Sequence, residues 1–104
     1  MQLRVSSPGN QLAEDDIDQI QKDLEKLDRR LSKFEDVYAW VRIQGKENLP
    51  VRSVVLEVEY GRKHLIAKAE AEDPLQAVRE ARDEILRQIN DRSRGGHSSY
   101  AKRT

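Results

Sequence analysis

The sequence predicts one α+β domain with the element order β-α-β-β-β-α, in which a four-stranded mixed sheet carries two helices on one face. Two segments have apolar residues at intervals of three and four, which is the spacing of one helix face. Four shorter segments alternate apolar and polar residues, as strands with one buried face do. The 104 residues leave room for a single hydrophobic core.

The first strand and the first helix are expected in the N-terminal third of the chain. Leu3 and Val5 alternate with polar neighbours in residues 2–6, and the proline and glycine of residues 7–10 then indicate a loop. Acids at residues 14–16 precede the helix, where they interact well with the positive end of the helix dipole. The apolar face of the helix consists of Ile17, Ile20, Leu24, Leu27, Leu31 and Phe34.

Three further strands are predicted as an antiparallel meander. They span residues 37–44, 54–59 and 64–69, with turns at residues 45–50 and 60–62. Because a helical crossover joins the first strand to the second, we expect these two strands to be parallel. The residues expected to face the helices are Val37, Ala39, Val41, Ile43, Val54, Leu56, Val58, Leu65, Ala67 and Ala69.

A second helix and a tail complete the chain. Asp73 is a plausible N-cap, Pro74 suits the first helical position, and the helix should end near Asp91. Its inward residues are Leu75, Val78, Ala81, Ile85 and Ile89. Arg82 interrupts this stripe: it either extends along the sheet edge or marks a rotated helix in which Leu86 joins the core. We expect a folded domain at residues 1–92 and a flexible basic tail at residues 93–104.

Composition argues against several classes of function. The chain has no cysteine and no long apolar segment, so we expect no disulfide, no zinc ribbon, no membrane span and a cytoplasmic location. His64 and His97 lie in different predicted elements, and no Gly-rich loop stands between a strand and a helix. We therefore expect no enzymatic activity, no metal and no cofactor. Net charge is 0, so any affinity for nucleic acid must come from local patches.

One such patch is a basic ridge along the first helix. Its cations project in similar directions, roughly opposite the apolar stripe, and the neighbouring acids lie on its flanks. The ridge consists of Lys22, Lys26, Arg29, Arg30 and Lys33. Cations on one line can neutralise successive phosphates and release their counterions. The same pattern also fits an ordinary solvated helix face with scattered ion pairs.

The sheet face that the helices leave uncovered is the second candidate surface. Residues expected there are Tyr38, Trp40, Arg42, Ile66 and Lys68. Aromatic rings with flanking cations can stack unpaired bases. The same residues could instead pack across strands or form a homodimer interface. Tyr38, Trp40, Arg42 and Lys68 are therefore candidates for either base stacking or self-association.

The segment from Leu24 to Tyr38, LEKLDRRLSKFEDVY, resembles the first helix and second strand of the bacterial hibernation-promoting factors, the ribosome-associated inhibitor family. Further matches are the sequence Ala71-Glu72-Asp73, then Ala77-Val78, then Arg87-Gln88-Ile89. With the element order, the resemblance covers about residues 1–92 and is to the short form of the family. It implies a ribosome-associated domain with the predicted fold and without enzymatic activity.

The resemblance also implies partners and site residues. Family members bind the small ribosomal subunit at the decoding region and stop translation under stress. Position by position, the rRNA-facing residues would be Lys26, Arg29, Lys33 and Arg87, with Lys22 and Arg30 adjacent on the ridge. The sequence departs from the family pattern in its charges. Asp23, Glu84 and Asp91 stand at commonly basic positions, and Arg79 stands at a usually acidic one.

A second hypothesis belongs to another class of function. The chain could be a divergent protein-interaction module of the same fold that pairs through the uncovered sheet face around Trp40 or through an edge strand. Binding to the small subunit and its rRNA would then be absent, and a homodimer would be the functional form.

Overall fold

The structure, a computed structural model, describes residues 1–7, 12–45 and 49–93. The centre of the predicted loop after the first strand, residues 46–48 of the next predicted turn, and residues 94–104 of the predicted tail lie outside the described residues. Within the described residues, no helix is both long enough and apolar enough to cross a membrane.

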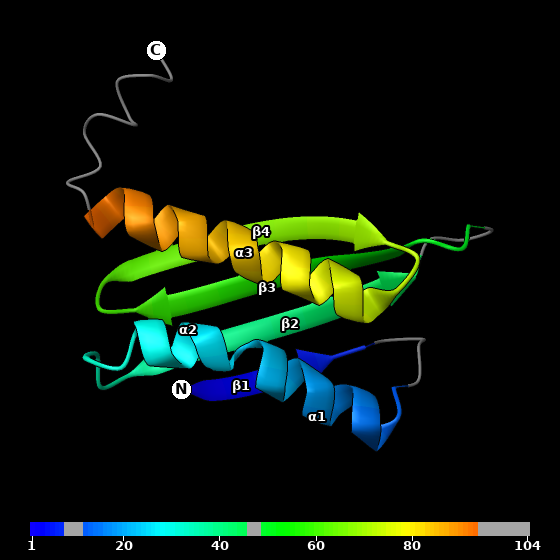
Figure 1. Ribbon diagram of the computed structural model, residues 1–104, viewed down its shortest axis with the longest axis horizontal. Helices are drawn as coiled ribbons and strands as arrows, with labels where there is room; N and C mark the ends of the chain where they lie inside the picture. Colours follow the sequence, from blue (N-terminus) through cyan, green and yellow to red (C-terminus); the bar gives the residue numbers. More distant parts are fainter. Residues whose placement is uncertain (8–11, 46–48, 94–104) are drawn as a thin grey trace, which may run out of the picture.

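The sheet has the predicted topology. Its strands are β1 (Gln2–Ser6), β2 (Val37–Gly45), β3 (Arg52–Tyr60) and β4 (Lys63–Ala71), and they lie side by side in that order. β1 and β2 are parallel, with Leu3 opposite Ala39, whereas β2–β3 and β3–β4 are antiparallel. The helices α1 (Glu14–Asp23), α2 (Glu25–Arg30) and α3 (Pro74–Ser93) cover one face of this sheet (Figure 1). The predicted α+β fold is therefore confirmed.

The first predicted helix differs in detail, because it is divided at Leu24 into α1 and α2. Here the Leu27 N–H donates to the Leu24 carbonyl, three residues back, at 3.0 Å. The Asp23 carbonyl oxygen accepts a hydrogen bond from the Arg82 guanidinium of α3 at 3.2 Å. α1 also begins at Glu14, so the acids form its first turn rather than preceding it. α2 ends at Arg30, which leaves Phe34 in the turn before β2.

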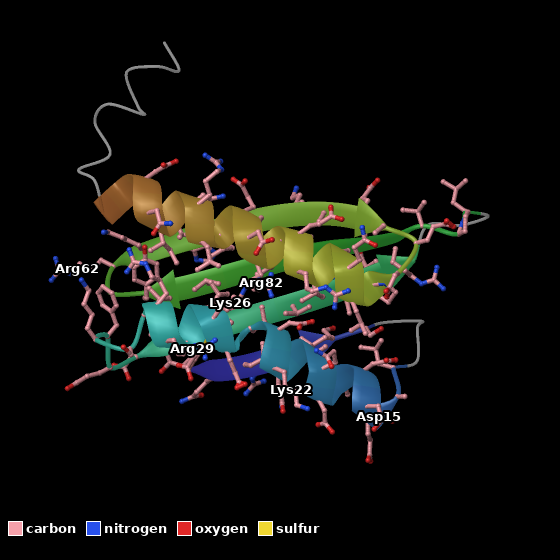
Figure 2. The ribbon with its side chains drawn as sticks, viewed as in Figure 1. Asp15, Lys22, Lys26, Arg29, Arg62 and Arg82 are labelled. Atoms are coloured by element: carbon pink, nitrogen blue, oxygen red, sulfur yellow. The ribbon has the colours of Figure 1, made fainter. Side chains whose placement is uncertain are left out.

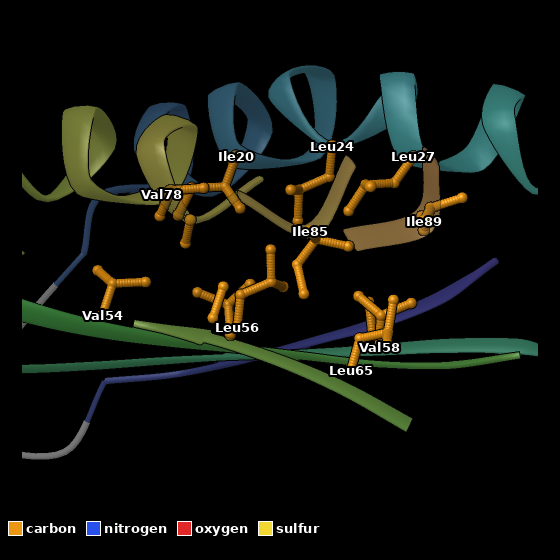
Figure 3. Packing of buried hydrophobic residues seen from close by; sticks show 14 of the residues in the cluster. Ile20, Leu24, Leu27, Val54, Leu56, Val58, Leu65, Val78, Ile85 and Ile89 are labelled. Atoms are coloured by element: carbon orange, nitrogen blue, oxygen red, sulfur yellow. The ribbon is translucent and has the colours of Figure 1, made fainter. Parts of the chain in front are cut away.

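The core lies between the helical layer and the sheet (Figure 3). Of the predicted inward residues, those of β2 and β3 are all buried, and in β4 only Ala69 is partly exposed. Leu24 is fully buried despite the break in the helix. Strict alternation along a strand places every second side chain on the same face, which explains why the sequence predicts these positions so well.

Local interactions position the ends of the elements. Asp73 caps α3 as predicted, because its Oδ1 accepts a hydrogen bond from the Leu75 N–H at 2.9 Å. Gly61, in the turn between β3 and β4, has a φ of 57°, which glycine adopts without steric strain. Tyr60 was predicted to lie in this turn, but it ends β3 and is buried. Its ring packs edge-on against Phe34, with 4.9 Å between ring centroids.

Candidate nucleic-acid interface

The residues of the predicted basic ridge come from different segments of the structure. Lys22 lies on α1, Lys26 and Arg29 lie on α2, and Lys33 lies in the turn after α2. All four are exposed, as Figure 2 shows for Lys22, Lys26 and Arg29, and none of them has an ion-pair partner within the described residues. The Lys33 ammonium lies 5.6 Å from the centroid of the Phe34 ring. These four cations are thus available to a polyanion.

Arg30, the fifth ridge residue, has a structural contact. It is half-buried, and its Nε and Nη2 atoms donate to Oδ1 of Asn90 on α3 at 3.3 and 3.2 Å. This contact joins α2 to the last turns of α3. Arg30 therefore contributes to helix packing as well as to the charge of the ridge.

The acids flanking the ridge have partners elsewhere. Asp23 accepts a hydrogen bond from Gln19 at 3.0 Å and forms an ion pair with Arg79 of α3 at 3.3 Å. Asp28 pairs with the amino group of Met1 at 3.2 Å. Since both carboxylates have other partners, neither pairs with the lysines or with Arg29 in the structure.

Two of the family departures form one contact. These are Asp23 and Arg79, at two of the positions where the resemblance implies a charge of the opposite sign. The Asp23 side chain is only 11% exposed, and its ion pair with Arg79 joins α1 to α3. Opposite charges thus attract α1 and α3 to each other, and the mostly buried Asp23 carboxylate lies outside the exposed ridge.

Arg82 interrupts the apolar stripe of α3. Its side chain does not simply follow the sheet edge, and the burial of Leu86 is only one part of the observed arrangement. It is 8% exposed and points toward the α1–α2 break (Figure 2), where it donates to the Asp23 carbonyl. It also pairs with Asp83 at 2.8 Å. Leu86 is partly buried and packs against the core, as the rotated-helix alternative expected. Arg82 thus holds the break in the helix, and the sequence gives no signal for this partner because it is 59 residues away.

Arg87, the remaining candidate for rRNA contact, is neutralised within its own helix. Its guanidinium binds Glu84 and Asp91, three residues before it and four residues after it. The hydrogen bond with Glu84 raises the pKa of Arg87 above its ordinary value, and the hydrogen bonds from Arg87 and Gln88 lower the pKa of Glu84. This spacing was visible in the sequence and could have identified the pairing. Arg87 thus has ion-pair partners, unlike Lys22, Lys26, Arg29 and Lys33 of the ridge.

The four predicted residues of the uncovered sheet face have the same strand parity. Tyr38, Trp40 and Arg42 alternate with the buried residues of β2, and Lys68 alternates with those of β4. Tyr38 and Trp40 are half-buried, whereas Arg42 and Lys68 are exposed. The parity predicted from the sequence is confirmed, and the binding role of this face stays a prediction. Among the described residues, no group of three or more His, Cys, Asp or Glu is arranged to hold a metal ion.

Comparisons with known proteins give matches at the level of structure. No protein-family model and no curated protein matches the sequence. The N-terminal domain of Protein Y from Thermus thermophilus superposes with a TM-score of 0.74 at 19% identity, covering 86% of this chain and 96% of that chain. A ribosomal subunit interface protein from Coxiella burnetii superposes with a TM-score of 0.72 at 15% identity, covering 89% and 98%. The resemblance noted in the sequence is therefore confirmed at the level of the fold.

Proposed function

We propose that this chain is a non-enzymatic, cytoplasmic protein that binds the small ribosomal subunit through its rRNA. In this proposal the protein occupies the decoding region and inhibits translation under stress. The occupied site and the effect on translation derive from the family resemblance. One of the structurally similar proteins is named as a ribosomal subunit interface protein, which supports a ribosomal partner.

The observation that carries the proposal is the unpaired charge of the ridge. Lys22, Lys26, Arg29 and Lys33 are exposed and have no ion pair within the described residues. Unpaired cations can bind phosphates without first breaking an internal contact. The mechanism is steric, because the residues supply binding and no reacting group. With about four phosphate contacts, the logarithm of the affinity should fall with the logarithm of salt concentration with a slope of about −3 to −4.

Co-sedimentation with purified small subunits, at low and high salt and with a generic RNA as competitor, tests the proposal. Lys26→Glu/Arg29→Glu should weaken binding about a hundredfold or more, because two phosphate contacts become repulsions. The matched control is Arg62→Glu/Lys63→Glu, which makes the same change in net charge at two exposed residues outside the ridge, one in the β3–β4 turn and one at the first position of β4. The control should bind nearly as well as the parent protein.

Two results would contradict this function. Unchanged binding by the ridge variant would exclude the ridge from the interface. Equal losses in the ridge variant and in the control would show that net charge, rather than a defined surface, determines binding. Circular dichroism of each variant verifies that the fold is retained.

A further inference from the structure

The sheet face opposite the helices, here called the open face, carries a continuous row of rings. Tyr38 and Trp40 on β2 stack with their ring centroids 6.1 Å apart and an interplanar angle of 21°. Trp40 also stacks with His64 of β4, at 6.5 Å and 11°. The described helices, α1, α2 and α3, all lie on the other side of the sheet (Figure 1). Three nearly parallel rings therefore border on solvent.

Cations surround these rings and are unpaired. Arg4 of β1 lies directly opposite Trp40 in the sheet register, and Arg42 follows Trp40 by two residues on the same face. Lys68 lies in the same row as Arg42, with Val55 between them. All three cations are exposed and have no ion pair within the described residues. The open face therefore offers positive charge next to aromatic surface.

Two acids of this face, Glu57 and Glu59, gather around one side chain, whereas Glu70 lies two residues after Lys68 on β4. His64 lies 3.5 Å from a Glu57 carboxylate oxygen and 3.2 Å from one of Glu59. Because these carboxylates contact His64 on the β3–β4 side, Arg4 and Arg42 on the β1–β2 side remain unpaired. A hollow of about 590 Å³ lies between the two groups, lined among others by Arg4, Trp40, Arg42 and Glu57. This volume is in the range of sites that bind small ligands or single bases.

We propose that the open face binds an unpaired RNA strand, independently of the ridge. Bases stack on Trp40 and Tyr38, since every base has a planar face and such stacking tolerates any sequence. Arg4, Arg42 and Lys68 bind the phosphates of the same strand. The carboxylates of Glu57 and Glu59 can accept hydrogen bonds from exocyclic amino groups or from ribose 2′-hydroxyls.

Charge complementarity favours RNA over a second copy of the chain. A two-fold contact places the same patch on both sides of an interface. Such a contact would offer Arg4, Arg42 and Lys68 only the carboxylates of the same face, Glu57, Glu59 and Glu70, and two of these, Glu57 and Glu59, already contact His64. A phosphate backbone instead supplies the negative charge that these cations lack, and bases supply flat surfaces for the rings.

Trp40 provides a direct readout, because it is the only tryptophan of the chain. Titration with a short oligoadenylate should quench its emission in a saturable and salt-dependent way. Tyr38→Ser should weaken this binding about tenfold through the loss of one stacked base. Arg4→Ser/Arg42→Ser should reduce the magnitude of the salt slope by about 1.4, since each phosphate contact to a single strand contributes about 0.7.

The ridge variant Lys26→Glu/Arg29→Glu separates this site from the proposed function. It should lose co-sedimentation with small subunits and still show quenching of Trp40 by the oligoadenylate. Quenching that is lost in the ridge variant and unaffected by Arg4→Ser/Arg42→Ser would overturn the second site. Survival of the quenching would preserve the second site even if the ridge failed to bind ribosomes.

Three other results would overturn the inference. The first is the absence of quenching by any oligoribonucleotide. The second is equal competition by inorganic polyphosphate, which has no bases and would show that charge alone is recognised. The third is a change in Trp40 emission with protein concentration, without RNA and with a dimer mass in analytical ultracentrifugation. That result would assign the open face to self-association.

Discussion

The α1–α2 segment and α3 lie side by side on the sheet (Figure 1), yet they use their cations differently. Lys22, Lys26 and Arg29 of α1–α2 are exposed and unpaired within the described residues, whereas Arg79, Arg82 and Arg87 of α3 all form ion pairs. A count of cations would rate both helices as possible RNA-binding surfaces. The ion pairs distinguish the two helices, because a cation that is already bound to a carboxylate gains less free energy on binding a phosphate.

The positions of the acids explain the difference. On α3, Glu84 and Asp91 lie three and four residues from Arg87, within reach on the same helix face. On α1–α2, Asp23 and Asp28 lie beside the ridge but bind Arg79 and the amino group of Met1. Arg79, Arg82 and Arg87 thus mainly stabilise the fold, whereas the ridge lysines and Arg29 remain available to bind phosphates.

The largest expected effect comes from reversing one charge of the Asp23–Arg79 pair. Asp23→Lys should lower the free energy of unfolding by about 1–3 kcal/mol, because a second cation then faces Arg79 at a mostly buried position. Adding Arg79→Glu should restore most of this loss by re-forming the pair with opposite signs. Urea denaturation of the single and double variants measures the coupling. A double variant less stable than either single variant would show that these two charges do not act as a pair.

A smaller effect is expected from freeing Arg87. Glu84→Gln/Asp91→Asn removes both carboxylates that bind it, and so adds an unpaired cation to the helical layer. Affinity for small subunits should rise several-fold, and the salt slope should become steeper by about 0.9. Arg87→Gln in the same background is the control and should cancel the gain. Unchanged affinity in the double variant would show that Arg87 lies outside the interface.

The smallest effect is the pH dependence of the Glu84 contact. The hydrogen bonds from Arg87 and then Gln88 lower the pKa of Glu84 below 4.5 in the folded protein. When folding lowers the pKa of a carboxyl group, the group stabilises the folded protein at pH values above its pKa in the unfolded chain. This stabilisation is lost as the pH falls through the pKa of the group in the folded protein. Glu84→Gln should therefore be less stable than the parent at neutral pH, with the difference shrinking below pH 4.5.

The midpoints of urea denaturation of the parent and of Glu84→Gln, measured across this pH range, test this expectation. The Arg87→Gln background is the control, since it lacks the main hydrogen-bond donor to Glu84. There the pH-dependent part of the difference should be much reduced. A difference between parent and Glu84→Gln that grows toward acid pH would contradict the assignment.

Local pattern was sufficient for the order of the elements and for the buried faces of the strands. The alternation of Val37, Ala39, Val41 and Ile43 identifies a buried strand face because successive side chains point to opposite sides. Asp73 followed by Pro74 identifies the start of α3, because a side-chain cap and a fixed proline φ both act within a few residues. The exposure of Lys22, Lys26 and Arg29 agrees with the same helical period, and so does the spacing of Arg87 from Glu84 and Asp91.

Tertiary structure decided which charged side chains are paired within the protein and which are available for binding. The division of the first helix at Leu24, the burial of Arg82 and the Asp23–Arg79 pair all depend on α3 packing against α1, with partners more than 50 residues apart. The enclosure of His64 by Glu57 and Glu59 depends on the register of β3 and β4. Sequence periodicity determines the face on which a side chain lies, because that depends only on local backbone geometry. It does not determine the partner across that face, because distant elements must first be brought together by burial of the shared core.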